Sequence, residues 1–418
     1  MTLDTTDLVV VVALLALAPI ARAGLERWRV RVPLVVVEIV FGILAGPAVF
    51  GWVAPDGQPL AALSDFGLVM LMFLAGFEID VPRIKGAPLR SAVAVWFVSL
   101  GLGLAAGLAM TLPFHDPSTT GISVGLALTT TALGTFLPII RDAGLLPTPL
   151  GAQVMAIGTV GEFAPIVAIA LLLSGRHPGA TVAALAIFAV LAAVCVWLAV
   201  KPNPRWLDRL VVKTLHSSGQ LAIRLAMLVM VLLVWFADRL ELDNLIGAFT
   251  AGLVLRLALA DAPGRLVETV SAKLDAIAFG FLVPIFFVMS GVKFDLDALL
   301  HDPGLLARIP VFLLLFLAVR GLPTFISARR GELAPESREL ALFASTALPL
   351  IVVITTIAVE NDYLLSGSAA AMVGAGMFSV LIFPQLALGR QEAAPGTGEG
   401  RPESEDAGGL EDEILRDR

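Results

Sequence analysis

Residues 153–172 read QVMAIGTVGEFAPIVAIALL, and Glu162 is their only charged side chain. Twenty residues in helical conformation are about 30 Å long, which matches the hydrocarbon thickness of a lipid bilayer. The stretch therefore predicts a helix that crosses a membrane with a carboxylate close to its middle. An ionised carboxylate at that depth is costly unless it is paired or hydrated, so it usually marks an ion or proton site.

The composition of the whole chain agrees with a membrane protein. Of its 418 residues, 58% are apolar and 15% are charged, whereas soluble domains carry about 25% charged residues. One cysteine and four scattered histidines offer neither a disulfide framework nor a metal-ligand spacing. One tyrosine and a net charge of −7 argue against nucleic-acid binding. We expect an all-α polytopic membrane protein with no cofactor, no resident metal and no nucleic-acid partner.

Apolar runs separated by polar, Pro or Gly residues predict about thirteen transmembrane helices. The distribution of Lys and Arg supports this number, because 22 of the 28 fall on one side of the predicted membrane, three on the other and three within spans. By the positive-inside rule, the N-terminus is then outside and the C-terminus is cytoplasmic, in a cell inner (plasma) membrane. The predicted spans are 7–23, 33–50, 60–78, 90–112, 119–140, 150–174, 179–200, 217–237, 244–260, 272–292, 304–328, 338–358 and 364–388.

The chain also repeats itself at about half its length. FGLVMLMFLAGFEID (66–80) resembles FGFLVPIFFVMSGVKFD (279–295), with Gly76 matching Gly291 and Asp80 matching Asp295 at an offset of 215. The first span then corresponds to the eighth, and a shift by seven spans inverts one copy relative to the other, as in many secondary transporters.

These boundaries divide the chain into a transmembrane domain and a tail. The domain covers 1–390, with a first repeat at about 7–174, a linker helix at 179–200 and a second repeat at about 217–388. Residues 391–418 hold nine acids and three arginines among Gly and Pro, a composition that predicts a disordered acidic cytoplasmic tail.

Inverted-repeat transporters bind their substrates near the midplane, where helices are interrupted. Two matching stretches favour such breaks: LALTTTALGTFLP (126–138) and LFASTALPLIVVITT (342–356). Their Thr, Gly and Pro residues let backbone carbonyls leave the helical ladder and face a cavity.

Three of the charged residues within predicted spans are candidates for a functional role. We interpret Glu162 as a cation or proton site; the alternative is a carboxyl group that stays protonated or locks an ion pair. Arg320 could reach the cytoplasmic interface, pair with a buried acid, or oppose the negative ends of the interrupted helices. Glu38 lies five residues into the second span, and a structural and a functional role are equally compatible with that position.

The sequence resembles the bacterial monovalent cation:proton antiporters, the group that includes the sodium/proton exchangers and the membrane part of Kef-type potassium efflux systems. The resemblance covers nearly all of 1–390. It implies an inverted-repeat antiporter fold with two crossed broken helices, a moving core of spans 4–6 and 11–13, and a dimerising scaffold of spans 1–3 and 8–10. The stretches that carry it are PLVVVEIVFGILAGP (33–47), LSDFGLVMLMFLAGFEID (63–80), LIGAFTAGLVL (245–255) and FLVPIFFVMSGVKFDLD (281–297).

The resemblance also implies site residues. The family carries an Asp-Asp or Asn-Asp pair in its sixth span, and Gly161-Glu162 stands at that position here. Glu162 matches the ion-binding acid, whereas Gly161 departs from the pattern, which favours one-for-one, electroneutral exchange. Arg320 matches the basic residue before the second broken helix. The resemblance implies that the site is lined by Thr129, Thr130 (the first choice as ligand), Thr131, Ser345 and Thr346.

These observations predict a secondary transporter that exchanges Na⁺ or K⁺ for H⁺ by alternating access, as a homodimer in the lipid bilayer. Two alternatives on the same scaffold are a cation channel or uniporter, and a sodium-coupled organic-anion symporter. A membrane enzyme is the least favoured class, because the sequence contains no nucleophile motif and no metal-ligand spacing.

Overall fold

A computed structural model describes residues 5–27, 32–55, 57–79, 84–111, 117–173, 178–200, 220–260, 262 and 264–388. Every regular element in these ranges is a helix. Residues up to Ala387 form one compact unit, and a second unit begins at Leu388, the last described residue. The predicted acidic tail at 391–418 and Asp80 lie outside the described residues.

The described helices confirm the predicted spans. Ten are long and apolar enough to cross a membrane, and α2 and α12 are shorter apolar helices. The remaining predicted span is a pair of short helices, α6 and α7, separated by five residues.

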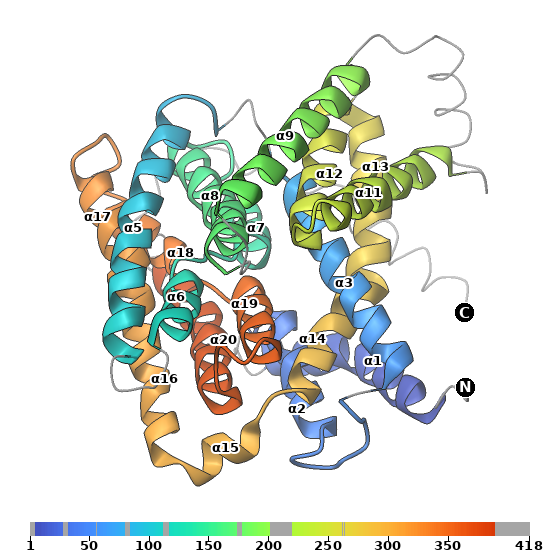
Figure 1. The fold of residues 1–418 in the computed structure, drawn as a ribbon, viewed down its shortest axis with the longest axis vertical. Helices are drawn as coiled ribbons and strands as arrows, with labels where there is room; N and C mark the ends of the chain where they lie inside the picture. The colour runs from blue at the N-terminus through green and yellow to red at the C-terminus, as the bar shows by residue number, and fades with distance from the viewer. Residues whose placement is uncertain are drawn as a thin grey trace. The chain divides into compact units, whose positions relative to one another are not determined.

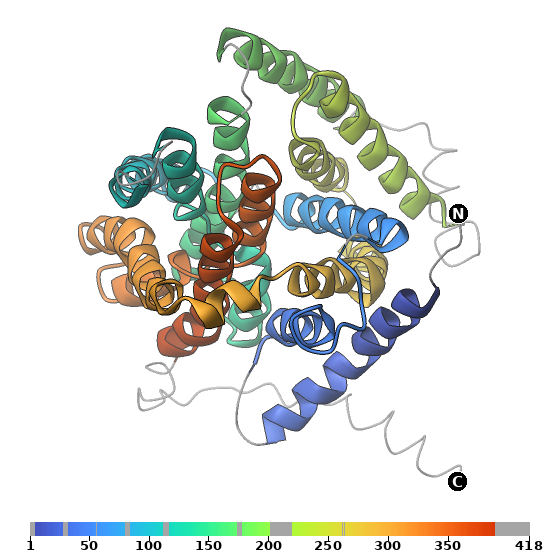
Figure 2. The same ribbon diagram turned by 60° about the horizontal axis from the view of Figure 1, so that its bottom comes forward.

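The helices pack in two groups, which lie beside each other in Figures 1 and 2. We call the first group the scaffold. It contains α1 (Thr5–Arg27), α2 (Leu34–Ala45), α3 (Gln58–Phe77), α11 (Leu221–Arg239), α12 (Asn244–Ala258), α13 (Gly264–Ile277), the π-helical turn η1 (Ala278–Leu282) and α14 (Val283–Val292).

We call the second group the core. It contains α5 (Ala87–Thr111), α6 (Pro117–Ala127), α7 (Leu133–Asp142), α8 (Pro149–Leu172), α16 (Pro303–Phe316), the π-helical turn η2 (Leu317–Gly321), α17 (Leu322–Arg329), α18 (Ser337–Ala344), α19 (Pro349–Glu360) and α20 (Ser366–Leu388). Two connecting helices join the groups, α9 (Pro178–Val200) and α15 (Leu296–His301).

Two glycine crossings hold the scaffold together, and each joins one repeat to the other. Gly42 on α2 meets Gly291 on α14, and a Cβ on Gly42 would overlap the carbonyl of Val288. Gly76 on α3 and Gly252 on α12 cross in the same way, with no room for a Cβ on either residue. The sequence match of Gly76 with Gly291 therefore reflects equivalent packing, because both glycines let two helix backbones touch.

Both predicted helix breaks are present in the core. The first lies between α6 and α7, and the second between α18 and α19. The two interrupted chains are bonded to each other, since Ala132 N donates to Thr346 O at 2.8 Å and Thr131 Oγ1 donates to Ala344 O at 2.8 Å. The breaks also obey the repeat offset of 215: TALG at 131–134 aligns with TALP at 346–349.

Candidate functional site

Glu162 lies on α8 beside the first helix break and is 5% exposed. Its Oε1 accepts a hydrogen bond of 3.4 Å from the backbone N–H of Gly134, the second residue of α7. Its Oε2 is buried and has no hydrogen-bond partner among the described residues. One carboxylate oxygen is thus held by the protein and the other is left available.

The first turn of α7 is a favourable place for a negative charge. Its backbone N–H groups have no partner within the helix, and the helix dipole is positive at this end. A buried carboxylate oxygen without a partner is nevertheless costly. A proton or a cation on Oε2 would remove that cost, so the arrangement can bind either one.

Arg320 lies in the π-helical turn η2 and is 1% exposed. Its guanidinium donates to Thr131 Oγ1 from Nε at 3.0 Å and from Nη2 at 2.7 Å, and Nη2 also donates to the carbonyl of Ile157 at 3.3 Å. Its Nη1 is buried with no partner among the described residues. π-Helical turns often occur at functional sites, where they change the direction of a side chain.

The contacts of Arg320 can be set beside its three interpretations. The guanidinium does not reach the interface, and no ion pair joins it to an acid in the described part of the chain. Instead it bonds Thr131, which bonds the carbonyl of Ala344 at the C-terminal end of α18. A cation at a helix C-terminus opposes the negative end of the dipole. Arg320 thus lies beside the C-terminal end of α18 through Thr131, and Glu162 lies beside the N-terminal end of α7.

Gly161 leaves the space that Arg320 occupies. A Cβ at this position would lie 2.6 Å from Cβ and Oγ1 of Thr131 and 2.7 Å from Nη2 of Arg320. The carbonyl of Gly161 accepts a hydrogen bond from Thr131 N at 3.0 Å. A side chain on residue 161 would displace the contact between Thr131 and Arg320, which gives a steric reason for the glycine beside Glu162.

The other predicted lining residues are buried at the two breaks. Thr129 and Thr130 donate to carbonyls of α6, at 2.7 and 2.9 Å, and Ser345 and Thr346 donate to carbonyls of α18, at 2.7 and 3.0 Å. Such bonds compete with the helical ladder and help to end a helix. The ligand role of Thr130 stays a prediction. Thr131 differs from the rest because its hydroxyl joins Arg320 to α18.

Glu38 is 4% exposed on α2, in the scaffold. No hydrogen bond or ion pair joins it to Glu162 or Arg320 among the described residues. The scaffold does reach the site at α12, because the ring of Phe249 stacks on Phe163, the residue after Glu162, with centroids 4.7 Å apart. Glu78, at the end of α3, adds a second carboxylate that acts electrostatically on Glu162.

Sequence reasoning missed the backbone groups of the site. These are the N–H of Gly134 and the carbonyls of Ile157 and Ala344. The repeat offset could have found the first of them: it aligns Gly134 with Pro349, so only the first repeat has an N–H to offer there. No group of three His, Cys, Asp or Glu suited to a resident metal occurs within the described residues.

Comparisons with known proteins point to one family. The family model described as "Sodium/hydrogen exchanger, transmembrane" matches residues 9–387. YjbQ of Bacillus subtilis is 27% identical over 405 residues, which cover 92% of this chain but 63% of YjbQ. The Na⁺/H⁺-K⁺ antiporter GerN of Bacillus cereus is 26% identical over 282 residues, which are 66% of this chain and 69% of GerN.

Solved structures agree on the fold. The sodium proton antiporter MjNhaP1 of Methanocaldococcus jannaschii superimposes with a TM-score of 0.64 at 16% identity, covering 92% of this chain and 97% of that protein. At this level of identity the similarity establishes the antiporter fold alone. The chain thus shares its architecture with MjNhaP1 and its sequence pattern with the family model.

Proposed function

The chain belongs to the sodium/hydrogen exchanger family, and we propose that it exchanges a monovalent cation, Na⁺ or K⁺, for H⁺ by alternating access. Glu162 is the shared binding site for the proton and the cation. The similar proteins named above are antiporters, which supports this class of activity. The proposal includes a multi-pass protein of the inner membrane, with its N-terminus outside, that works as a homodimer.

One observation carries the proposal: Glu162 is buried beside the two helix breaks. Its Oε1 accepts a hydrogen bond from the first turn of α7, and its Oε2 has no partner among the described residues. Either a proton or a dehydrated cation would neutralise this carboxylate. The core then moves only when the site is neutral, because an exposed charge is costly in the closed barrier. This requirement couples the two fluxes.

The surroundings of Glu162 support a one-for-one, electroneutral exchange. Gly161 cannot supply a second acid, and its place is filled by Thr131 and Arg320. A guanidinium keeps its proton in proteins, so Arg320 cannot release a second one. The core therefore carries the same net charge with a proton or with a monovalent cation on Glu162.

Fluorescence of a pH-gradient dye in everted vesicles tests this function. Na⁺, K⁺ or Li⁺ is added after a gradient is established, with wild type and with Glu162→Gln. We expect one or more cations to dissipate the gradient in wild type, and we expect Glu162→Gln to abolish the effect because the amide cannot bind the proton. Exchange by the Gln variant would show that the carboxylate has been misassigned.

Two controls separate the alternatives. Glu38→Gln removes a buried carboxylate from the scaffold. Exchange by this variant would show that the carboxylate required for exchange is the one beside the helix breaks, Glu162. A wild-type protein that conducts cations without moving protons would be a channel or uniporter. A folded protein that moves no inorganic cation across pH 6–9 would instead direct attention to organic anions as substrates.

A further inference from the structure

A cavity of about 130 Å³ lies between the scaffold and the core. One wall is the end of α14 and the following segment, from Ser290 to Asp295. The other wall is formed by α19 and α20, from Val352 to Glu360 and from Ser366 onward. The space is large enough for a cation with part of its water shell.

The cavity extends inward along α19 toward the helix break. Its lining on this helix runs from Glu360 to Val352, which at 1.5 Å per residue corresponds to about 12 Å. Val352 is three residues from Pro349, where α19 begins directly after the second helix break. The inner end of the cavity thus lies about one helical turn from the interrupted chain.

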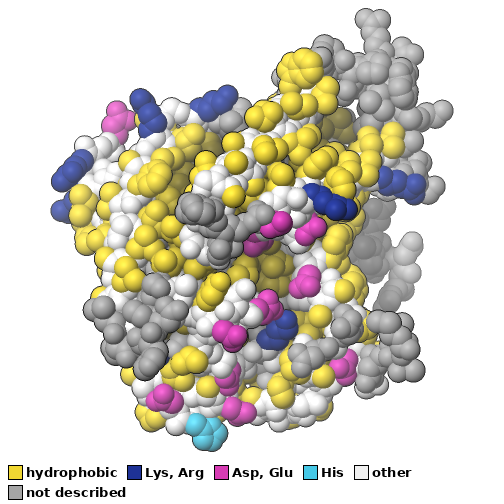
Figure 3. All heavy atoms as spheres, in the orientation of Figure 1, with side chains coloured by type: hydrophobic (Ala, Val, Ile, Leu, Met, Phe, Trp, Pro, Cys, Tyr) yellow, Lys and Arg dark blue, Asp and Glu magenta, His cyan; other side chains and the backbone are white. Residues whose placement is uncertain are grey.

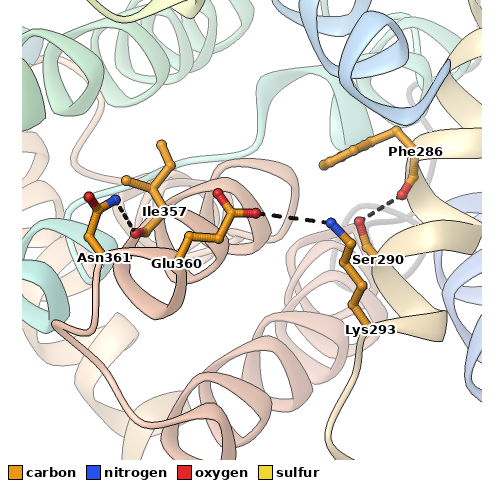
Figure 4. Close-up of polar contacts among 6 residues, drawn as sticks. All are labelled: Phe286, Ser290, Lys293, Ile357, Glu360 and Asn361. Carbon is orange, nitrogen blue, oxygen red and sulfur yellow. Dashed lines mark hydrogen bonds and ion pairs between the residues drawn. The ribbon is translucent and has the colours of Figure 1, made fainter. Parts of the chain in front are cut away.

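An ion pair bridges the mouth of this cavity. Lys293 Nζ lies 4.0 Å from Glu360 Oε1, with the two side chains 38% and 62% exposed. Figure 4 shows them extending toward each other from opposite elements, with the dashed line crossing the gap between α14 and α19. The pair therefore ties the scaffold to the core.

Glu360 is poorly placed for the stability of its own helix. It is the last residue of α19, and a carboxylate at a helix C-terminus faces the negative end of the dipole. Asn361 already satisfies that end, because its Nδ2 donates to the carbonyl of Ile357 at 2.8 Å. The favourable partner of Glu360 among the described residues is Lys293, across the mouth.

A second tie crosses the same boundary. Ser366 Oγ, at the start of α20, donates to Asp295 Oδ2 at 2.5 Å. The other oxygen of Asp295 caps α15 by accepting from Ala298 N at 3.0 Å. Two short segments of the scaffold side, at Lys293 and Asp295, thus hold two segments of the core side.

The surroundings of the mouth are acidic. Figure 3 shows Asp and Glu side chains gathered on the middle and lower part of this face, over α14, α15 and α19. A concentration of negative charge beside a cavity raises the local concentration of cations. By the positive-inside rule, this end of α14 and α19 faces the outside of the cell.

We propose that this cavity is the outer ion pathway and that Lys293 and Glu360 form the latch that closes its mouth. The ammonium group of Lys293 stands where an incoming monovalent cation would otherwise neutralise Glu360. The core separates from the scaffold here when the site opens to the outside. This inference rests on the proposed exchange function. Because an exposed ion pair is weak, breaking it shifts the balance between outer-closed and outer-open forms by about fivefold or less, which is about 1 kcal/mol.

Sided kinetics in proteoliposomes test the latch. Lys293→Met and Glu360→Gln both break the pair, so both should lower the KM for cation added at the outer face, by up to about fivefold. Simple attraction of cations by Glu360 would instead raise the KM in Glu360→Gln. Asp297→Asn, an exposed acid of α15 that does not line the cavity, is the matched control for lost charge. Unchanged outer KM values in both latch variants would overturn the proposal.

Cross-linking gives a second and independent test. Lys293→Cys and Glu360→Cys are combined in a Cys195→Ser background, which removes the one native cysteine. A membrane-impermeant bis-methanethiosulfonate added outside should then stop exchange, and reduction should restore it; each single cysteine is a control. Full exchange by the cross-linked protein would show that the mouth does not open. A wild type without exchange refutes the proposed function, whereas an exchanging wild type with an insensitive latch refutes this inference alone.

Discussion

The backbone N–H of Gly134 donates to Glu162, and replacing Gly134 by proline removes that donor. Gly134 is the second residue of α7, and its N–H donates to Glu162 Oε1 at 3.4 Å. A Cβ at this position would meet no atom within 4 Å. Gly134→Ala therefore fits and keeps the N–H, which makes it the matched control.

Proline should be accepted at this position. The second repeat has Leu348–Pro349 where the first has Leu133–Gly134, and α19 begins at Pro349. In the first turn of a helix, proline sacrifices no hydrogen bond within the helix. The change thus removes a donor to the carboxylate while the broken-helix geometry is retained.

The size of the effect follows from the hydrogen bond that is lost. Hydrogen bonds to charged groups contribute about 1.5–3 kcal/mol, and 3.4 Å is longer than the usual N–H···O distance. We therefore take about 1–1.5 kcal/mol, which is about a five- to tenfold change in an equilibrium constant. In the proposed function, this N–H stabilises the carboxylate form of Glu162 to which the cation binds, so the KM for cation should rise by that factor relative to Gly134→Ala.

The assay is the initial rate of cation-dependent dye dequenching in everted vesicles, measured at one fixed pH over a range of cation concentrations. Wild type, Gly134→Ala and Gly134→Pro are compared at equal amounts of folded protein. A KM for the proline variant within twofold of the alanine variant would refute the argument that α7 supports Glu162 through this N–H.

Two further predictions concern stability. Gly161→Ala should lower the free energy of unfolding by about 1–3 kcal/mol, since its Cβ would press on Thr131 and Arg320; thermal unfolding in detergent checks this, with Gly101→Ala, which meets no atom within 4 Å, as control. Burial raises the pKa of Asp243, the N-cap of α12, above its usual value. The charged form is therefore disfavoured in the folded state, and stability should fall as pH rises through that raised pKa. Asp243→Asn keeps an acceptor for Leu245 N and should gain stability over wild type at pH 8 but not at pH 4; an equal difference at both would contradict the burial argument.

Much of the fold could be predicted from the sequence because the bilayer restricts the structures that a spanning chain can form. Each span must be about 20 apolar residues long or be shielded by its neighbours, and each interruption must satisfy its backbone groups inside the protein. Runs of apolar residues therefore locate the helices, and the Thr, Gly and Pro clusters at 126–138 and 342–356 locate both breaks. The family resemblance is confirmed as well.

The partners within the site could not be predicted in this way. The contact of Arg320 with Thr131 joins residues 189 apart, and nothing in an apolar pattern specifies which side chains meet across helices. Backbone donors and acceptors, such as Gly134 N and Ile157 O, leave no mark of their own in the sequence. Lys293 and Glu360 are half-exposed residues at helix ends, so sequence alone presents them as ordinary loop charges.

The two glycine crossings of the scaffold make the two repeats depend on each other for packing. Gly42 meets Gly291, and Gly76 crosses α12 beside Gly252, so these two crossings each take one glycine from each repeat. A protein containing one repeat alone would have both halves of the contact surface but no partner to complete either crossing. Each repeat therefore needs the other, in the opposite orientation, before either helix pair can close.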